Sequence, residues 1–156
     1  MVGKIAIEEI ERKRQVIDEL STFIWNNPEA GFKEYKAHEK AAALMEEEGF
    51  QVERGAGGVP TAIKAVYGSG HPVIGFMGEF DALPGLSQKV SVDKEEIEGQ
   101  PYGHGCGHNL LCAAHVGGAI GLKEEMKQRN LPGTIIFYAC PGEELLTGKP
   151  LMAKGG

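Results

Sequence analysis

The sequence predicts an α/β fold with a mostly parallel central sheet. Two continuous apolar runs carry this prediction, "VIGFM" at 73–77 and "TIIFYAC" at 134–140. Apolar runs without polar alternation are typical of strands that are covered on both faces. Residues 109–130 lie between them and carry small and apolar residues at helical spacing. Strand, helix and strand in this order predict a βαβ unit at the centre of the fold.

Two helices precede the predicted sheet. Apolar residues separated by charged ones predict an amphipathic helix over residues 5–26: Ile10, Ile17, Leu20 and Ile24. The sequence "NNP" at 26–28 ends this helix. The same pattern predicts a second helix, which ends at Gly49. Its apolar residues are Ala37, Ala41, Leu44 and Met45.

The middle of the chain continues with a strand, a turn and the helix of the βαβ unit. "TAIKAVY" at 61–67 predicts the strand, and "GSGHP" at 68–72 predicts the turn before "VIGFM". Asn109 is the predicted N-cap of the following helix. One side of that helix has small residues, which would let it lie close against the sheet: Leu110, Ala113, Ala114, Gly117 and Gly121.

Composition indicates a single domain that acts on small molecules or binds other proteins. The chain has 156 residues and a net charge of -6, which disfavours binding to nucleic acid. It has no apolar run of about 18 residues, so we expect no membrane span. The sequence starts without a signal-peptide core and contains three cysteines, an odd number. We therefore expect a cytoplasmic protein with reduced thiols.

Polar segments follow both apolar strands directly. "GEFDALPG" at 78–85 offers Glu79 and Asp81, and "PGEEL" at 141–145 offers Glu143 and Glu144. "GHGCGHN" at 103–109 leads into the helix that connects the two strands. Because ligands gather beyond the carboxyl ends of parallel strands, the three segments are expected to meet at one edge of the sheet.

The residue types in these segments suit a divalent metal ion. Cysteine thiolate, imidazole and carboxylate are ligands of zinc and similar ions, and Cys106 and His108 can curl around one ion. Of the neighbouring glutamates, one can hold the ion while the other takes a proton from water. His104 could be a third ligand, a partner of a ligand or a loop residue.

Several of these residues also have purely structural interpretations. Asp81 could be a turn residue before "LP" at 83–84, Glu79 could be exposed, and Glu143–Glu144 could be a solvated pair. Three other histidines are expected to have no role in the site. His115 is predicted to pack within its helix, whereas His38 and His71 are predicted to be surface or turn residues.

The motifs together resemble a known family. "NNPEAGFKE" at 26–34, "GEFDALPG", "GHGCGHN" and "CPGEE" occur in the order typical of the metal-dependent amidohydrolase and aminoacylase-carboxypeptidase superfamily. The resemblance extends over nearly the whole chain, and its nearest branch is the aminobenzoyl-glutamate hydrolases. It implies a three-layer α/β/α architecture like that of zinc peptidases.

The resemblance also implies roles for individual residues. Cys106, His108 and Glu144 match metal ligands, and Glu143 matches the general base for hydrolysis of an amide bond. The substrate would be an N-acyl or aminobenzoyl amino acid or a short peptide, and the ions one or two of zinc or manganese. Asp81 matches a catalytic-site aspartate that, in carboxypeptidase relatives, follows two places after a histidine ligand. Glu79 occupies that earlier place, so the resemblance leaves Asp81 without a histidine to orient.

Relatives in this family are more than twice as long as this chain. Residues 1–156 therefore match the N-terminal portion of a catalytic domain, with the lid or dimerisation domain and the C-terminal half absent. We expect the chain alone to have little or no amidase activity and to hold at most one ion. A sheet truncated in this way would expose an apolar face or edge strand, which favours homo-oligomers.

Two other functions remain open at this stage. Cys106 could act as a nucleophile with His108 or His104 as its base, although two residues on one loop are poorly placed for this. The chain could also be a non-catalytic fragment, or an interaction module that holds a metal for stability.

Overall fold

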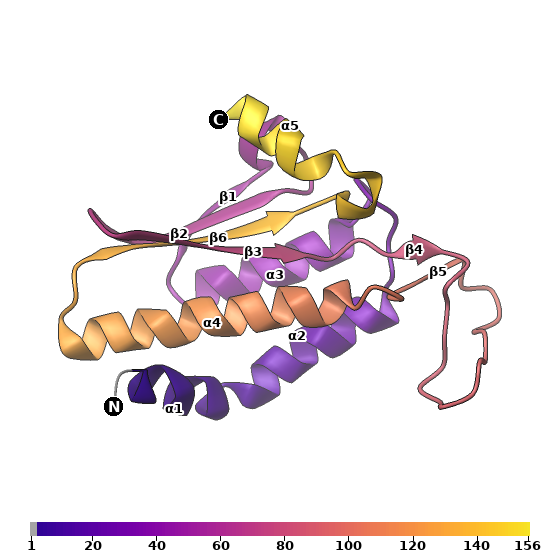
Figure 1. Ribbon diagram of the computed structural model, residues 1–156, viewed down its shortest axis with the longest axis horizontal. Coiled ribbons are helices and arrows are strands. Elements are labelled where there is room, and N and C mark those ends of the chain that lie inside the picture. Colours follow the sequence, from indigo (N-terminus) through magenta and orange to yellow (C-terminus); the bar gives the residue numbers. More distant parts are fainter. Residues whose placement is uncertain (1–2) are drawn as a thin grey trace.

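The computed structural model describes residues 3–156 and shows an α/β fold built on a four-stranded sheet (Figure 1). The strands lie in the order β1 (Gln51–Arg54), β2 (Ile63–Ser69), β6 (Gly133–Cys140) and β3 (Val73–Glu79). β3 and β6 are parallel, and β2 is antiparallel to both of its neighbours. Three of the four strands therefore run in one direction, and the predicted α/β class is confirmed.

The two apolar runs occupy different places in the sheet. β6 lies inside it, and its alternate residues Ile135, Phe137 and Ala139 are fully buried. β3 is an edge strand of the described sheet, and its apolar side chains are partly uncovered: Val73, Ile74 and Met77. The prediction that both runs are covered on both faces is wrong for β3. An apolar run indicates a strand, but it does not say which segment covers that strand.

Helices lie on both sides of the sheet, as expected for a three-layer fold (Figure 1). α4 (His108–Arg129) and α3 (Tyr35–Glu47) pack on one face. α1 (Lys4–Arg12) and α2 (Arg14–Asn26) pack on the outer side of α4. On the opposite face, the short helix α5 (Gly148–Gly155) packs against β6 and the 3-10 turn η1 (Ala56–Gly58). This arrangement places α4 between the sheet and the first two helices.

The single helix predicted over residues 5–26 is two helices that meet at Lys13. The backbone of Lys13 leaves helical geometry at φ -94° and ψ 4°. Its Nζ pairs with Glu48 at the end of α3, and Lys123 Nζ of α4 lies 2.9 Å from the other oxygen of Glu48. The apolar periodicity continues through the break, so the sequence pattern alone did not reveal it. The second predicted helix is confirmed as α3 (Tyr35–Glu47). As predicted, a glycine follows its end, since Gly49 adopts a left-handed conformation.

The small residues of α4 face a different neighbour from the predicted one. A Cβ at Gly117 would lie 3.0 Å from Ile17 of α2, and one at Gly121 would lie 2.9 Å from the carbonyl oxygen of Ala6 in α1. Gly118 is the glycine that faces the sheet, against Phe76 of β3. Of the predicted face, Gly117 and Gly121 therefore face the N-terminal helices rather than the sheet, and Leu110 is exposed.

The start of α4 also differs from the prediction. Gly107, in a left-handed conformation, is the N-cap, and the helix begins at His108. Asn109 is thus a residue of the helix itself, and its side-chain amide donates to Ser21 Oγ of α2 at 3.1 Å. This start places His108 in the first turn of α4, where its side chain is directed towards the ends of β3 and β6.

Some elements lay outside the sequence prediction. β1 was not predicted, nor were the small pair β4 (Leu83–Pro84) and β5 (Tyr102–Gly103), the 3-10 turn η2 (Glu143–Leu145) and α5. The chain between β4 and β5 forms a loop that projects from the body (Figure 1). Within residues 3–156 no helix combines the length and the apolar character needed to cross a membrane.

The main core fills the space between the helices and the sheet. Its fully buried side chains come from α2, α3, α4 and the strands, and the largest aliphatic and aromatic ones are Leu20, Ile24, Met45, Ile63, Phe80, Ile120, Ile135 and Phe137. A smaller cluster lies beneath α5 and includes Cys140 and Met152. Both clusters hold β6 firmly, so the loop that follows it leaves from a fixed point.

Candidate metal centre

Three segments distant in sequence meet where β3 and β6 end. The two strands are parallel and in register, so Glu79 at the end of β3 lies opposite Cys140 at the end of β6. Asp81 follows β3, Glu143 and Glu144 form η2 after β6, and Cys106 and His108 lie at the start of α4. The predicted meeting of these segments at one edge of the sheet is what the structure shows.

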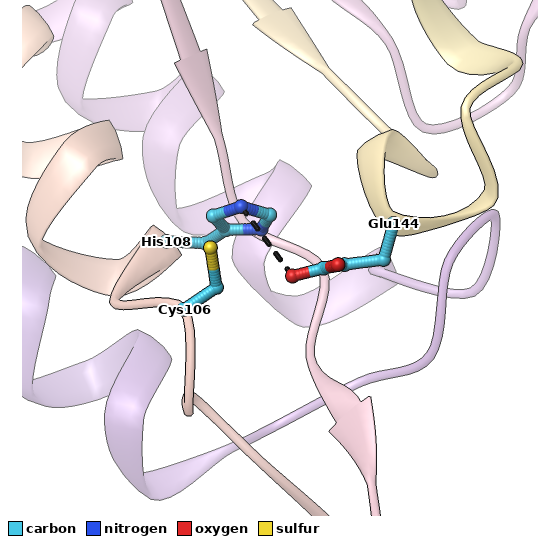
Figure 2. Close-up of side chains that lie close together, drawn as sticks. All are labelled: Cys106, His108 and Glu144. Atoms are coloured by element: carbon cyan, nitrogen blue, oxygen red, sulfur yellow. Dashed lines mark ion pairs between the residues drawn. The ribbon is translucent and has the colours of Figure 1, made fainter.

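The three predicted ligands lie together. Cys106 Sγ, a ring nitrogen of His108 and a carboxylate oxygen of Glu144 are all within 4.8 Å of one another. Figure 2 shows the carboxylate of Glu144 directed at the His108 ring from the η2 side, with the Cys106 thiol beside the ring. Cys106 is exposed, whereas His108 is buried. The group is therefore buried on one side and open to solvent on the other.

Asp81 fixes the orientation of the His108 ring. Nδ1 of His108 lies 2.9 Å from Asp81 Oδ1 and 2.9 Å from the Asp81 carbonyl oxygen. Both oxygens are acceptors, so Nδ1 carries the proton and donates it. This leaves Nε2 free to bind a cation. The expectation that Asp81 has no histidine to orient is wrong, because the histidine comes from α4 rather than from two places earlier in the sequence.

Asp81 also joins two loops of the site. Its second oxygen, Oδ2, accepts the backbone N–H of Glu144 at 3.0 Å. Burial by itself would raise the pKa of Asp81, but its hydrogen bonds with His108 and Glu144 outweigh burial and lower that pKa. For His108, burial would lower the pKa, and the hydrogen bond and charge of Asp81 outweigh it and raise the pKa. The pair is thus a charge-assisted hydrogen bond that locks the ring.

Acidic groups surround the free side of His108. Its Nε2 lies 3.6 Å from Glu143 Oε2, 3.8 Å from Glu144 Oε1 and 4.0 Å from Glu79 Oε2. Partial desolvation of its sulfur, together with the charge of Glu144, raises the pKa of the Cys106 thiol. Such a concentration of negative charge is unfavourable unless a cation balances it.

The donor set fits a divalent cation. Glu144 Oε1 is buried and has no hydrogen-bond partner among the described residues, although buried carboxylate oxygens are normally paired. Thiolate, imidazole and carboxylate are the ligand types that zinc accepts, and three protein ligands leave a fourth position open. The geometry and the unpaired oxygen both favour an ion between these side chains.

Lys149 is a charged neighbour that no sequence motif indicated. It lies in α5, and its Nζ pairs with Glu79 Oε1. Burial would lower the pKa of Lys149, but the bond to Glu79 outweighs burial and raises it. Glu79 is therefore neither exposed nor free, since the lysine holds one oxygen while the other faces His108. Only the fold of α5 brings Lys149 to this place.

The remaining histidines lie outside the ligand group. His104 is buried, donates from Nε2 to the Ile24 carbonyl at 3.1 Å and stacks on Trp25. Burial lowers its pKa. The prediction that His38 is a surface or turn residue is wrong, because it is buried in α3 and donates to the Thr61 carbonyl. His71 is an exposed turn residue as predicted, and His115 is a partly exposed helix residue.

Curated relatives match almost the whole chain, whereas no protein-family profile matches it. One of the subunits of p-aminobenzoyl-glutamate hydrolase from Escherichia coli is 42% identical over 148 residues, which are 94% of this chain and 31% of that protein. Thermostable carboxypeptidase 2 of Saccharolobus solfataricus is 32% identical over 139 residues, 85% of this chain and 34% of that protein. The chain thus spans about a third of the length of the curated relatives it matches.

Solved structures show the same fold. A dinuclear metal-binding peptidase of the M20 family from Bacillus subtilis superposes with a TM-score of 0.73 at 24% identity. It covers 92% of this chain, which in turn covers 40% of that structure. A protein from methicillin-resistant Staphylococcus aureus, assigned to the aminohydrolases, gives a TM-score of 0.77 over 99% of this chain and 39% of its own.

Proposed function

This chain is homologous over nearly its whole length to a segment of the M20 amidohydrolases and peptidases, and on that premise we propose that it carries the metal-holding half of an amide-hydrolysing active site. One observation supports the proposal above all others. Cys106, His108 and Glu144, from two separate segments, place three ligand atoms within 4.8 Å of one another. Asp81, just after β3, and Glu143, in η2, complete the group.

Cys106, His108 and Glu144 would hold the ion. When bound, it would lower the pKa of a coordinated water to about 7 and stabilise negative charge on the substrate oxygen. A thiolate ligand favours zinc over manganese, because soft sulfur donors prefer the softer ion. The three donors supply one ion, whereas the related Bacillus subtilis peptidase is described as dinuclear. We therefore assign one ion to this chain.

Glu143 is the proposed general base. Its carboxylate lies 3.6 Å from His108 Nε2, and its side chain keeps 31% of its surface exposed, so water can reach it. A carboxylate in this position can take a proton from the attacking water and return it to the leaving nitrogen. Asp81 is buried and both of its carboxylate oxygens are bonded, to His108 and to the backbone of Glu144, so we assign it as a positioning residue for His108.

The proposed substrate is an N-acyl or aminobenzoyl amino acid, or a short peptide. The relative at 42% identity is named for aminobenzoyl-glutamate, and another relative, from Campylobacter jejuni, is named a hippurate hydrolase. The net charge of -6 supports a small-molecule partner rather than nucleic acid. Because the three donors provide for one ion, whereas the related Bacillus subtilis peptidase is described as dinuclear, we propose that residues 1–156 alone hydrolyse such substrates slowly or not at all.

Metal binding by the purified chain tests the first part of the proposal. We expect about one zinc ion per chain, measured by elemental analysis after dialysis against metal-free buffer. Cys106→Ser and Glu144→Gln should each lose it. Glu98→Gln is the matched control, because it removes the same charge from an exposed residue of the projecting loop. No bound ion in the folded wild-type chain would overturn the proposed metal centre.

Hydrolysis is measured on the longest natural gene product that contains this sequence, with aminobenzoyl-glutamate as substrate. We expect a chelator to abolish activity and zinc to restore it. Glu143→Gln should retain the ion but lose at least a hundredfold in rate, in line with the usual contribution of a general base. Activity that survives the chelator and depends on Cys106 would instead favour a cysteine nucleophile. Tight metal binding without hydrolysis of any tested amide would favour a non-catalytic module.

A further inference from the structure

Glu34 is a buried carboxylate next to the metal centre whose two oxygens are both bonded. It is 0% exposed, which is unusual for a glutamate. Its Oε1 accepts the backbone N–H of Gly142 at 2.8 Å, and its Oε2 accepts the hydroxyl of Thr61 at 2.8 Å. Gly142 immediately precedes Glu143 and Glu144. The bond from Glu34 therefore reaches the loop that carries the proposed base and one proposed ligand.

The rest of the segment around Glu34 packs on the same loop. The Phe32 ring lies so close to Gly142 that a Cβ there would meet its atoms at 2.6 Å. Gly31 faces the same loop, since a Cβ on it would lie 3.0 Å from Leu145. Phe32 itself has a positive φ of 62°, which is uncommon for a non-glycine residue. The chain between α2 and α3 is thus shaped closely around the start of η2.

The same segment also holds the other loop of the site. The carbonyl oxygen of Glu29 accepts the backbone N–H of Ala82 at 2.8 Å, and Ala82 follows Asp81. Residues 29–34 therefore contact the loop after β3 through Glu29 and the loop after β6 through Glu34. We call residues 29–34 the clamp segment. Neither Glu29 nor Glu34 belongs to the ligand group, so any effect on the ion must pass through the loops.

We propose that Glu34 is a positioning residue that sets the η2 loop so that Glu143 and Glu144 face Cys106 and His108. This inference rests on the proposed metal centre and deepens it. Without an acceptor at residue 34, the buried N–H of Gly142 would lose its partner, and the loop would shift to find another. A shift of the loop moves Glu144 away from the histidine, because Glu144 is only two residues beyond Gly142.

Three variants separate positioning from general stability. Glu34→Met keeps the size of the side chain and removes the acceptor for Gly142. Glu34→Gln keeps an acceptor oxygen for Gly142 and should rescue the site. Thr61→Val is the matched control, because it removes a buried hydrogen bond from the same carboxylate and leaves the Gly142 bond intact.

The first measurement is hydrogen exchange of the Gly142 amide in the metal-free chain, followed by NMR. We expect this amide to be protected in the wild type, Glu34→Gln and Thr61→Val, and to exchange at least tenfold faster in Glu34→Met. The second is zinc affinity, from competition with a chelator. It should fall about 10- to 100-fold in Glu34→Met and stay within about threefold in the other two variants. Thermal unfolding is recorded for all variants.

The outcomes distinguish this inference from the proposed function. Glu34→Met with wild-type Gly142 protection and zinc affinity, whatever its thermal stability, would overturn the positioning role. Equal loss of zinc affinity in Thr61→Val would also overturn it, since the effect would then be one of stability. If the wild-type chain binds no zinc, the proposed function fails, and Gly142 exchange still decides whether Glu34 holds the loop. If Glu34→Met does not fold, Glu34→Asp replaces it, because the shorter carboxylate cannot reach Gly142 and Thr61 together.

Discussion

The chemistry of the site is organised around the two nitrogens of one imidazole ring. Nδ1 of His108 is held by Asp81, and Nε2 faces the carboxylates of Glu79, Glu143 and Glu144. Asp81 is also the residue that joins the loop after β3 to the backbone of Glu144. Because one carboxylate serves both contacts with different oxygens, a change at Asp81 should affect two ligands at once.

Asp81→Asn should weaken zinc binding about 10- to 100-fold. An asparagine can accept from His108 with its oxygen, but its NH₂ group then faces the N–H of Glu144, where the wild type has an acceptor. Competition with a chelator, monitored by a zinc indicator, measures the change. Asp93→Asn, in the exposed loop between β4 and β5, is the control. Equal affinity in Asp81→Asn and the wild type would show that the ring needs no such partner.

The stability of the chain should depend on pH through Glu34. Burial raises the pKa of Glu34, despite the hydrogen bonds that favour its charged form. The folded state therefore binds the proton more tightly than the unfolded state, so stability falls as pH rises from about 4.3 to the raised folded pKa. Glutamine does not titrate. Above about pH 4.3, Glu34→Gln should thus be more stable than the metal-free wild type. The gain is about 1.4 kcal/mol for each tenfold difference between the proton affinities of Glu34 in the folded and unfolded chain. Urea unfolding between pH 4 and 7 measures this difference, and a difference independent of pH would contradict it.

Among the elements, α4 packs closely against neighbours on two sides, the N-terminal helices and the sheet. Gly117 and Gly121 let α2 and α1 approach, while His108 in the first turn of α4 contributes to the candidate metal centre. The helical pattern predicted α4 and its small residues, because periodicity is a local property of the sequence. The predicted neighbour of these small residues, the sheet, was wrong for Gly117 and Gly121, since their neighbours depend on where α1 and α2 pack.

Gly121→Ala and Gly117→Ala should differ in stability although both replace glycine within one helix. The added methyl at 121 would meet the Ala6 backbone oxygen at 2.9 Å, which cannot move without shifting α1. We expect a loss of about 1–3 kcal/mol there, only partly offset by the better helix propensity of alanine. At 117 the methyl meets the tip of the flexible Ile17 side chain, so the change should be nearly neutral. Urea unfolding compares the two, and equal effects would contradict the packing described here.

At the scale of the whole molecule, the sheet is covered unevenly. Most of one face lies under α3 and α4, whereas β3 forms an edge with partly exposed apolar side chains. Unpaired edge strands of this kind can pair with another chain. The prediction that the chain self-associates therefore has a specific place, the edge strand β3, where Val73 and Met77 lie on one face and Ile74 on the other.

Self-association should appear in sedimentation velocity as the concentration of the chain rises. Val73→Lys places a charge on the exposed edge and should shift the distribution towards monomers. Val92→Lys adds the same charge in the projecting loop, where the valine is also exposed, and should leave the distribution unchanged. A wild-type chain that stays monomeric at every concentration would contradict the prediction.

The class of fold, most helices and strands, and the residues that gather at the candidate metal centre can all be inferred from the sequence. Periodicity and apolar runs are local, and the ends of two parallel strands meet wherever else the chain goes. Four other features became visible only in the folded chain: the break at Lys13, the edge position of β3, the bond between Asp81 and His108, and the bond from Gly142 to Glu34. Each of these depends on contacts between segments far apart in the sequence, and no local pattern records such contacts.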